Sequence, residues 1–99
     1  TIIGSDVTVG HNAIIHGATI KDRCLIGMGS VIMDDVVIGE GSIVGAGAVV
    51  PPNTIIPPRA LVVGLPAKII RKTTHEELEM IIERAKHYID FANEYKQEA

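Results

Sequence analysis

Aliphatic residues return every six positions along the first two thirds of the chain. One slot of this repeat is always Ile or Val, and glycine often follows it directly. The unit IHGAT, which begins at Ile15, is one residue short, and the six-residue phase then resumes. The slot residues are Ile3, Val9, Ile15, Ile20, Ile26, Ile32, Ile38, Val44, Val50, Ile56 and Val62. Such a fixed period predicts a protein built from stacked structural repeats.

The length of the period indicates what each repeat is. Six residues are too few for a β-hairpin and do not fit the 3.6-residue turn of an α-helix. They fit a short strand and a corner, with the branched slot residue pointing inward and the following glycine permitting the tight bend. Three such units would close one triangular coil, so residues about 18 apart, such as Ile26, Val44 and Val62, should stack. The pattern therefore predicts a mainly β solenoid.

Two further patterns extend this prediction. Compact residues stand four places after each slot: Val7, Ala13, Thr19, Cys24, Ser30, Val36, Ser42, Ala48, Thr54 and Ala60. Proline pairs at residues 51–52 and 57–58 replace glycine at the corners. Because proline fixes φ, these pairs should stiffen the last coils at their turns.

The pattern changes after residue 70. Thr74 and Glu77 form a capping box, which marks the start of a helix. Apolar residues follow at helical spacing: Leu78, Ile81, Ile82, Ala85, Tyr88, Ile89, Ala92 and Tyr95. We therefore expect a β domain over residues 1–70 and one amphipathic helix over residues 74–96, lying on the flank of the coils. His75 and His87 on this helix are expected to face solvent.

Composition and charge exclude several classes of function. The formal net charge is −3, which gives no electrostatic reason to expect a nucleic acid partner. No apolar run approaches the roughly 18 residues of a membrane span, and the first residues lack the pattern of a signal peptide. Cys24 is the single cysteine, so it forms no intramolecular disulfide and is expected to be a small buried residue. A cytoplasmic protein is the expectation.

The stretch VGHNAIIHG carries the candidate metal ligands, His11 and His16. Neither histidine occupies an inward slot, so both rings should lie outside the coil. Zinc binds neutral imidazole, usually through three protein ligands in a catalytic site. The two histidines stand on successive units, so we do not expect them to bind the same metal ion within a single chain. In a three-fold assembly, His11 of one chain could meet His16 of its neighbour.

The six-residue pattern resembles the hexapeptide-repeat family, whose fold is a left-handed parallel β-helix. Within it, the stretch from Thr8 to Asp34 closely resembles the gamma-class carbonic anhydrases. The resemblance implies a homotrimer in which each zinc is held by histidines of two chains, with His11 and His16 as two of three ligands. Tyr88 loosely matches a tyrosine of the C-terminal helix near the metal in some members.

The implied function is zinc-dependent, reversible hydration of carbon dioxide to bicarbonate at the trimer interface. Iron or cobalt would also accept imidazole ligands. In the family the third zinc histidine and the arginine, aspartate and glutamine of the pocket lie upstream of this pair, on earlier coils. This chain begins after those positions, so on its own we expect it to have little or no carbonic anhydrase activity; an additional N-terminal portion would restore the site.

Two other functions remain open from the residues. Hexapeptide-repeat proteins include acyltransferases that process acyl-coenzyme A, and there His11 or His16 would act as a general base without a metal. The third alternative is a non-catalytic trimeric scaffold. Acetyl-coenzyme A consumption in a chelator would favour the acyltransferase, and a zinc-free trimer would favour the scaffold.

Overall fold

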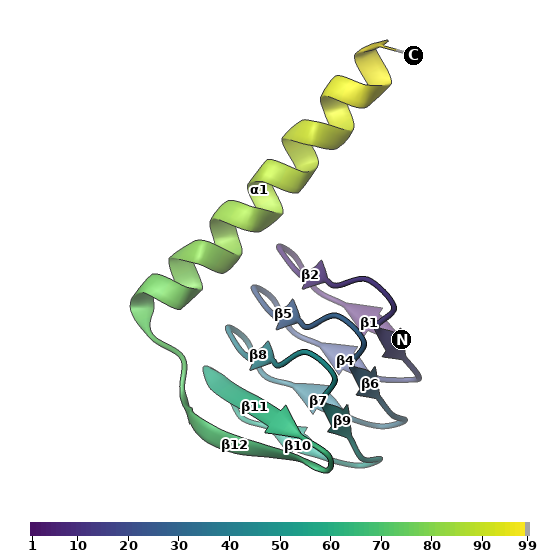
Figure 1. Cartoon of the computed structure of the whole chain (residues 1–99), viewed down its shortest axis with the longest axis vertical. Coiled ribbons are helices and arrows are strands. Elements are labelled where there is room, and N and C mark those ends of the chain that lie inside the picture. Colours follow the sequence, from purple (N-terminus) through teal and green to yellow (C-terminus); the bar gives the residue numbers. More distant parts are fainter. Residues whose placement is uncertain (99) are drawn as a thin grey trace.

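The computed structural model describes the backbone of residues 1–98 and the side chains of residues 1–86. Very short strands alternate with turns and are followed by a hairpin and one long helix (Figure 1). The short strands are β1 (Ile2–Ile3), β2 (Thr8–Val9), β3 (Ile14–Ile15), β4 (Thr19–Ile20), β5 (Leu25–Ile26), β6 (Val31–Ile32), β7 (Val37–Ile38), β8 (Ile43–Val44), β9 (Val49–Val50) and β10 (Ile55–Ile56). The hairpin and helix are β11 (Ala60–Gly64), β12 (Ala67–Lys72) and α1 (His75–Glu98).

The strands form three parallel sheets, one for each side of a triangular coil. Face A is β1-β4-β7-β10, face B is β2-β5-β8-β11, and face C is β3-β6-β9. Ile26 pairs with Val44, and Val44 pairs with Val62, which are the stacks expected from the repeat. The predicted fold class, a mainly β solenoid with a C-terminal helix, is confirmed.

The short unit at Ile15 changes the register of the first coil. Ile3 pairs with Ile20, whereas Ile20 pairs with Ile38, so the first coil is one residue shorter than the second. The missing residue comes out of the turn after β3, where Gly17 adopts a positive φ of 46°. The strands therefore stay aligned across the deletion.

The slot residues form the core. Those from Ile20 to Val62 are buried, whereas Ile3 and Val9 of the first coil remain 48% and 42% exposed, because that coil has a neighbour on one side only. One compact position departs from the spacing of the repeat. Ala18 is the buried residue at 1% exposure, and Thr19 is half-buried on β4. Counting four places forward from Ile15 fails because it crosses the missing residue.

The glycines that follow the slot were expected to permit the tight bend, and this expectation is wrong. A Cβ atom at Gly27 would lie 2.5 Å from the amide nitrogen of Ala46, and one at Gly39 would lie 2.4 Å from the nitrogen of Pro58. These glycines therefore permit close approach of the next coil. The left-handed bend falls two residues later, for example at Gly29 with a φ of 70°.

The last coil continues into β11, which pairs antiparallel with β12 and carries the chain to the helix. The predicted capping box is confirmed, since the Thr74 amide donates to Glu77 Oε1 at 2.8 Å and the Glu77 amide donates to Thr74 Oγ1 at 3.1 Å. From there α1 runs back along the solenoid toward the first coil and extends past β2 (Figure 1).

The apolar side of α1 faces the coils. Ile81 and Ala85 are buried, and α1 contacts β2 on face B. His75 is exposed, as expected, and its Nε2 lies 3.0 Å from Glu79 Oε1. The side chain of His87 lies outside the described residues. Within the described part of the chain, no helix combines the length and the apolar character that crossing a membrane requires.

Candidate functional site

His11 lies in the turn between β2 and β3, and His16 directly follows β3. The carbonyl oxygen of His11 accepts a hydrogen bond from the Gly29 amide at 2.9 Å, and the His16 amide donates to the Ile32 carbonyl at 2.8 Å. Both backbones are thus tied to the second coil, while both side chains are exposed. The two histidines lie in the turns at the two corners that bound face C, on the same coil.

The side chains of residues 1–86 do not gather a full set of metal ligands around either ring. Among the described residues, no three His, Cys, Asp or Glu side chains lie close enough together to hold a metal ion. A catalytic zinc ion usually takes three protein ligands and keeps one open position. The described residues therefore fit a metal only if further donors come from outside this set.

The surface between the two histidines is aliphatic. The outward residue of β3, Ile14, is 49% exposed, and Val31 and Val49 follow it along face C. Met28 and Met33 flank this face at the next coil, at 62% and 38% exposure. Exposed apolar side chains that gather on one face are typical of a surface that meets another protein.

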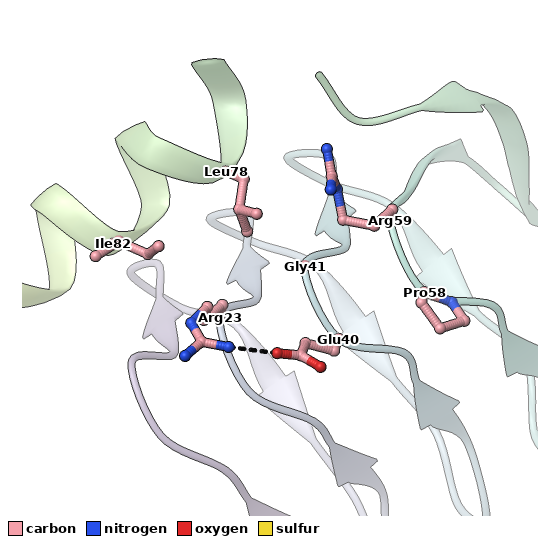
Figure 2. Close-up of a pocket in the computed structure, with 7 residues that line it drawn as sticks. All are labelled: Arg23, Glu40, Gly41, Pro58, Arg59, Leu78 and Ile82. Atoms are coloured by element: carbon pink, nitrogen blue, oxygen red, sulfur yellow. Dashed lines mark hydrogen bonds and ion pairs between the residues drawn. The ribbon is translucent and has the colours of Figure 1, made fainter. Parts of the chain in front are cut away.

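The third corner, where faces A and B meet, carries a groove that the sequence did not predict. It has a volume of about 500 Å³ and lies between this corner and α1 (Figure 2). An ion pair joins Arg23 and Glu40 within it. The lining residues are Arg23, Glu40, Gly41, Pro58, Arg59, Leu78 and Ile82. No sequence motif marks them, because they come from three coils and the helix.

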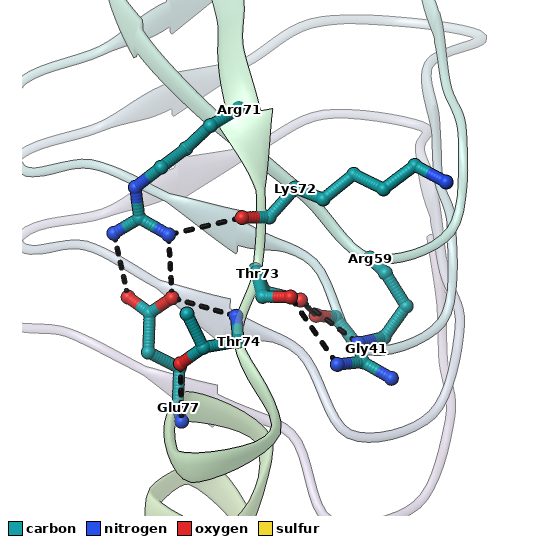
Figure 3. Close-up of polar contacts among 7 residues, drawn as sticks. All are labelled: Gly41, Arg59, Arg71, Lys72, Thr73, Thr74 and Glu77. Atoms are coloured by element: carbon teal, nitrogen blue, oxygen red, sulfur yellow. Dashed lines mark hydrogen bonds and ion pairs between the residues drawn. The ribbon is translucent and has the colours of Figure 1, made fainter.

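Polar contacts beside this groove connect the solenoid to the helix (Figure 3). Arg71 binds Glu77 through both guanidinium arms, and the Nη2–Oε2 distance is 3.0 Å. These bonds from Arg71, with a smaller contribution from the Thr74 amide, lower the pKa of the Glu77 carboxyl to about 2. The start of α1 is therefore anchored to the end of β12.

Cys24 is buried, as expected. Its thiol donates to the Gly39 carbonyl at 3.2 Å, and burial is the main reason that its pKa rises to about 11. A nucleophilic cysteine needs a thiolate, which this environment opposes. The Tyr88 side chain, the other candidate site residue, lies outside the described residues.

Comparison with known proteins identifies the repeat. The family described as bacterial transferase hexapeptide (six repeats) matches residues 1–32 and 17–52. A carbonic anhydrase of Geobacillus kaustophilus is 50% identical over 95 residues, which are 96% of this chain and 52% of that protein. The mitochondrial gamma carbonic anhydrase 2 of Arabidopsis thaliana is 45% identical over 98 residues, 99% of this chain and 35% of that protein.

A solved structure agrees with this assignment. The product of the BC4754 gene of Bacillus cereus, a proposed acetyltransferase, superposes with a TM-score of 0.91 at 38% identity, covering 98% of this chain and 62% of that one. The chain spans about half or less of the length of the carbonic anhydrases that it matches. The predicted resemblance is thus confirmed, and the chain belongs to the bacterial transferase hexapeptide family, with gamma carbonic anhydrases among its relatives.

Proposed function

We propose that His11 and His16 are metal ligands of a carbonic anhydrase-like site shared between copies of this chain. One observation carries the proposal: two exposed imidazoles stand at the two corners of one face, on one coil, with an aliphatic surface between them. The carbonic anhydrases among the relatives support the choice of reaction, the reversible hydration of carbon dioxide to bicarbonate.

The arrangement of face C explains why a second copy is needed. His11 lies in the turn between β2 and β3, and His16 directly follows β3, so the two exposed histidines belong to different corners. A copy packed against the aliphatic surface would cover Ile14, Met28 and Met33, and could bring its own histidine to the corner of its neighbour. A closed ring of such contacts gives the proposed homotrimer.

The described histidines would contribute ligands and not acid–base groups. Zinc bound to them would supply a nucleophile for carbon dioxide at neutral pH, because the metal lowers the pKa of water to about 7. Iron or cobalt could take the same place. A catalytic zinc site usually takes three protein ligands, so a third donor would have to join His11 and His16. Tyr88 near the metal and a cytoplasmic location remain predictions.

Metal analysis tests the ligand assignment. The purified protein, His11→Ala and His16→Ala are each equilibrated with zinc, desalted, and measured for bound metal and for oligomeric state. His75→Ala is the matched control, since His75 is an exposed histidine on α1. We expect both ligand variants to lose most of the bound zinc while the control retains it. Equal zinc in all four proteins would disprove the assignment.

An acyltransferase is the second candidate function. The similarity to the Bacillus cereus structure, a proposed acetyltransferase, favours it. In that case His11 or His16 would accept a proton from a hydroxyl or amine acceptor, and no metal would be required. Acetyl-coenzyme A consumption that persists in a chelator and falls in His11→Ala or His16→Ala would establish this function. A stable trimer without bound zinc and without either activity would indicate the scaffold.

A further inference from the structure

The groove between α1 and the corner of faces A and B lies away from both histidines. His11 and His16 stand at the other two corners of the coil, and face C between them is opposite this one. The groove therefore offers a binding site separate from the proposed metal site. Its volume of about 500 Å³ is in the range of small-molecule sites.

Two arginines at this corner adopt a backbone conformation that arginine uncommonly takes. Arg23 and Arg59 have φ values of 58° and 60°. At the other two corners the left-handed residues are Asn12, Gly17, Gly29, Asp35, Gly47 and Asn53, which are types that adopt positive φ more readily. Strain of this kind is a reason to look for a function. Both arginines line the groove.

Arg59 is held in position by Thr73. Its Nε donates to Thr73 Oγ1 at 2.9 Å and its Nη2 donates to the Thr73 carbonyl at 3.2 Å, and Thr73 itself is only 6% exposed. Within the described part of the chain, Nη1 of Arg59 has no hydrogen-bond partner. The guanidinium is therefore fixed by two bonds and keeps donors for an anion.

Gly41 makes room beside this arginine. A Cβ atom there would lie 2.6 Å from Cδ of Arg59 and 3.3 Å from Cδ1 of Leu78. Figure 2 shows Arg59 on one side of Gly41 and Leu78 on the other, with Ile82 one turn further along the helix. Leu78 is half-buried and Ile82 is 38% exposed, so the helix side of the groove is apolar.

The charges of the lining residues indicate which class of anion this groove favours. Two guanidinium groups and one carboxylate, that of Glu40, leave the groove with one net positive charge. Glu40 already pairs with Arg23, and its negative charge opposes a doubly charged ligand such as phosphate. A carboxylate matches the planar fork of arginine, and an apolar chain matches Leu78 and Ile82.

We infer that this groove binds a monocarboxylate with a short apolar chain. The carboxylate lies on the guanidinium of Arg59, and the chain lies along Leu78 and Ile82 toward the Arg23–Glu40 pair. This inference uses neither histidine and does not depend on the proposed function.

Titration of the isotope-labelled protein with butyrate and hexanoate tests the inference, read from backbone amide NMR shifts. We expect saturable shifts at Gly41 and Leu78, and tighter binding of hexanoate because it buries more apolar surface. Butyramide, which has the same size but no charge, and inorganic phosphate are expected to leave these amides unchanged. Equal binding of butyramide or phosphate, or no saturable shift with hexanoate, would overturn the proposal.

Substitutions locate the ligand. Arg59→Lys keeps the charge but loses the fork, and we expect it to weaken hexanoate binding about tenfold. Ile82→Glu is an exposed replacement that places a negative charge on the apolar wall, and we expect it to abolish binding. Arg84→Gln, an exposed change on the same helix, is the matched control and should bind like the parent. Unchanged affinity in both groove variants would show that the ligand binds elsewhere.

Discussion

Arg59 donates a hydrogen bond from Nε to Oγ1 of Thr73 at 2.9 Å, and this hydroxyl in turn donates to the Gly41 carbonyl at 3.0 Å (Figure 3). The contacts connect two coils of the solenoid to the segment that precedes α1. Because Thr73 is buried, loss of its hydroxyl would leave the Gly41 carbonyl without this donor. Thr73 therefore helps to hold the segment that precedes the helix, and with it one side of the groove, against these coils.

We predict that Thr73→Val lowers the free energy of unfolding by about 1–3 kcal/mol, the cost of leaving buried polar groups without partners. Urea denaturation followed by circular dichroism measures the change. Thr73→Ser retains the hydroxyl and should lose much less. If the valine and serine variants were equally stable, the hydroxyl would have no structural role.

The stacked core predicts a large effect of truncation at Ile26. This residue is fully buried between two coils, so Ile26→Ala should cost about 2–5 kcal/mol, from lost apolar burial and the cavity that remains. Ile55→Ala is the matched control, since Ile55 is 74% exposed on face A, and it should change stability by no more than about 0.5 kcal/mol. Similar losses in both variants would contradict the inward assignment of the slot.

Substitutions at two nearby glycines should differ in their effect on stability. Gly27→Ala places a methyl group 2.5 Å from the Ala46 nitrogen, so it should separate the coils and cost about 2 kcal/mol or more. Gly29→Asn should be tolerated within about 1 kcal/mol, because nothing lies within 4 Å of its Cβ position and asparagine accepts a positive φ. Thermal unfolding of the two variants distinguishes close approach from backbone conformation, and the reverse order would refute this distinction.

The Glu77 carboxyl should titrate far below the usual range. Its hydrogen bonds from Arg71 lower its pKa from 4.5 to about 2, so the bonds favour the ionised, folded form. This contribution to stability is fully present above pH 4.5, because both states are then ionised, and it is lost as the pH falls toward 2. Carboxyl carbon NMR shifts measured against pH test the pKa.

The matched variants for this titration are Arg71→Gln and Arg84→Gln. The first removes the partner of Glu77 and should raise the pKa of the carboxyl toward its ordinary value. The second removes an arginine elsewhere on α1 and should leave the titration unchanged. A Glu77 midpoint that is the same in the parent and in Arg71→Gln would show that the guanidinium does not lower the pKa.

The repeat could be predicted from sequence because each unit encodes its own local geometry. A branched residue every six positions determines which side chains point inward and which residues stack, as Ile26, Val44 and Val62 do. The capping box of Thr74 and Glu77 is equally local. The spacing shifts at Thr19, where the repeat lacks one residue, and Ala18 takes the buried position there.

Only the tertiary structure decided which contacts and which groove form between units that are distant along the chain. The close approach that Gly27 and Gly39 permit, and the groove that Arg23 and Arg59 line with Leu78, depend on coils and a helix meeting in space. A six-residue period contains no information about where α1 packs, because that placement is set by contacts such as Arg59 with Thr73. The sequence by itself determined the coil, and the packing of its corners against one another and the helix determined the surfaces available for binding.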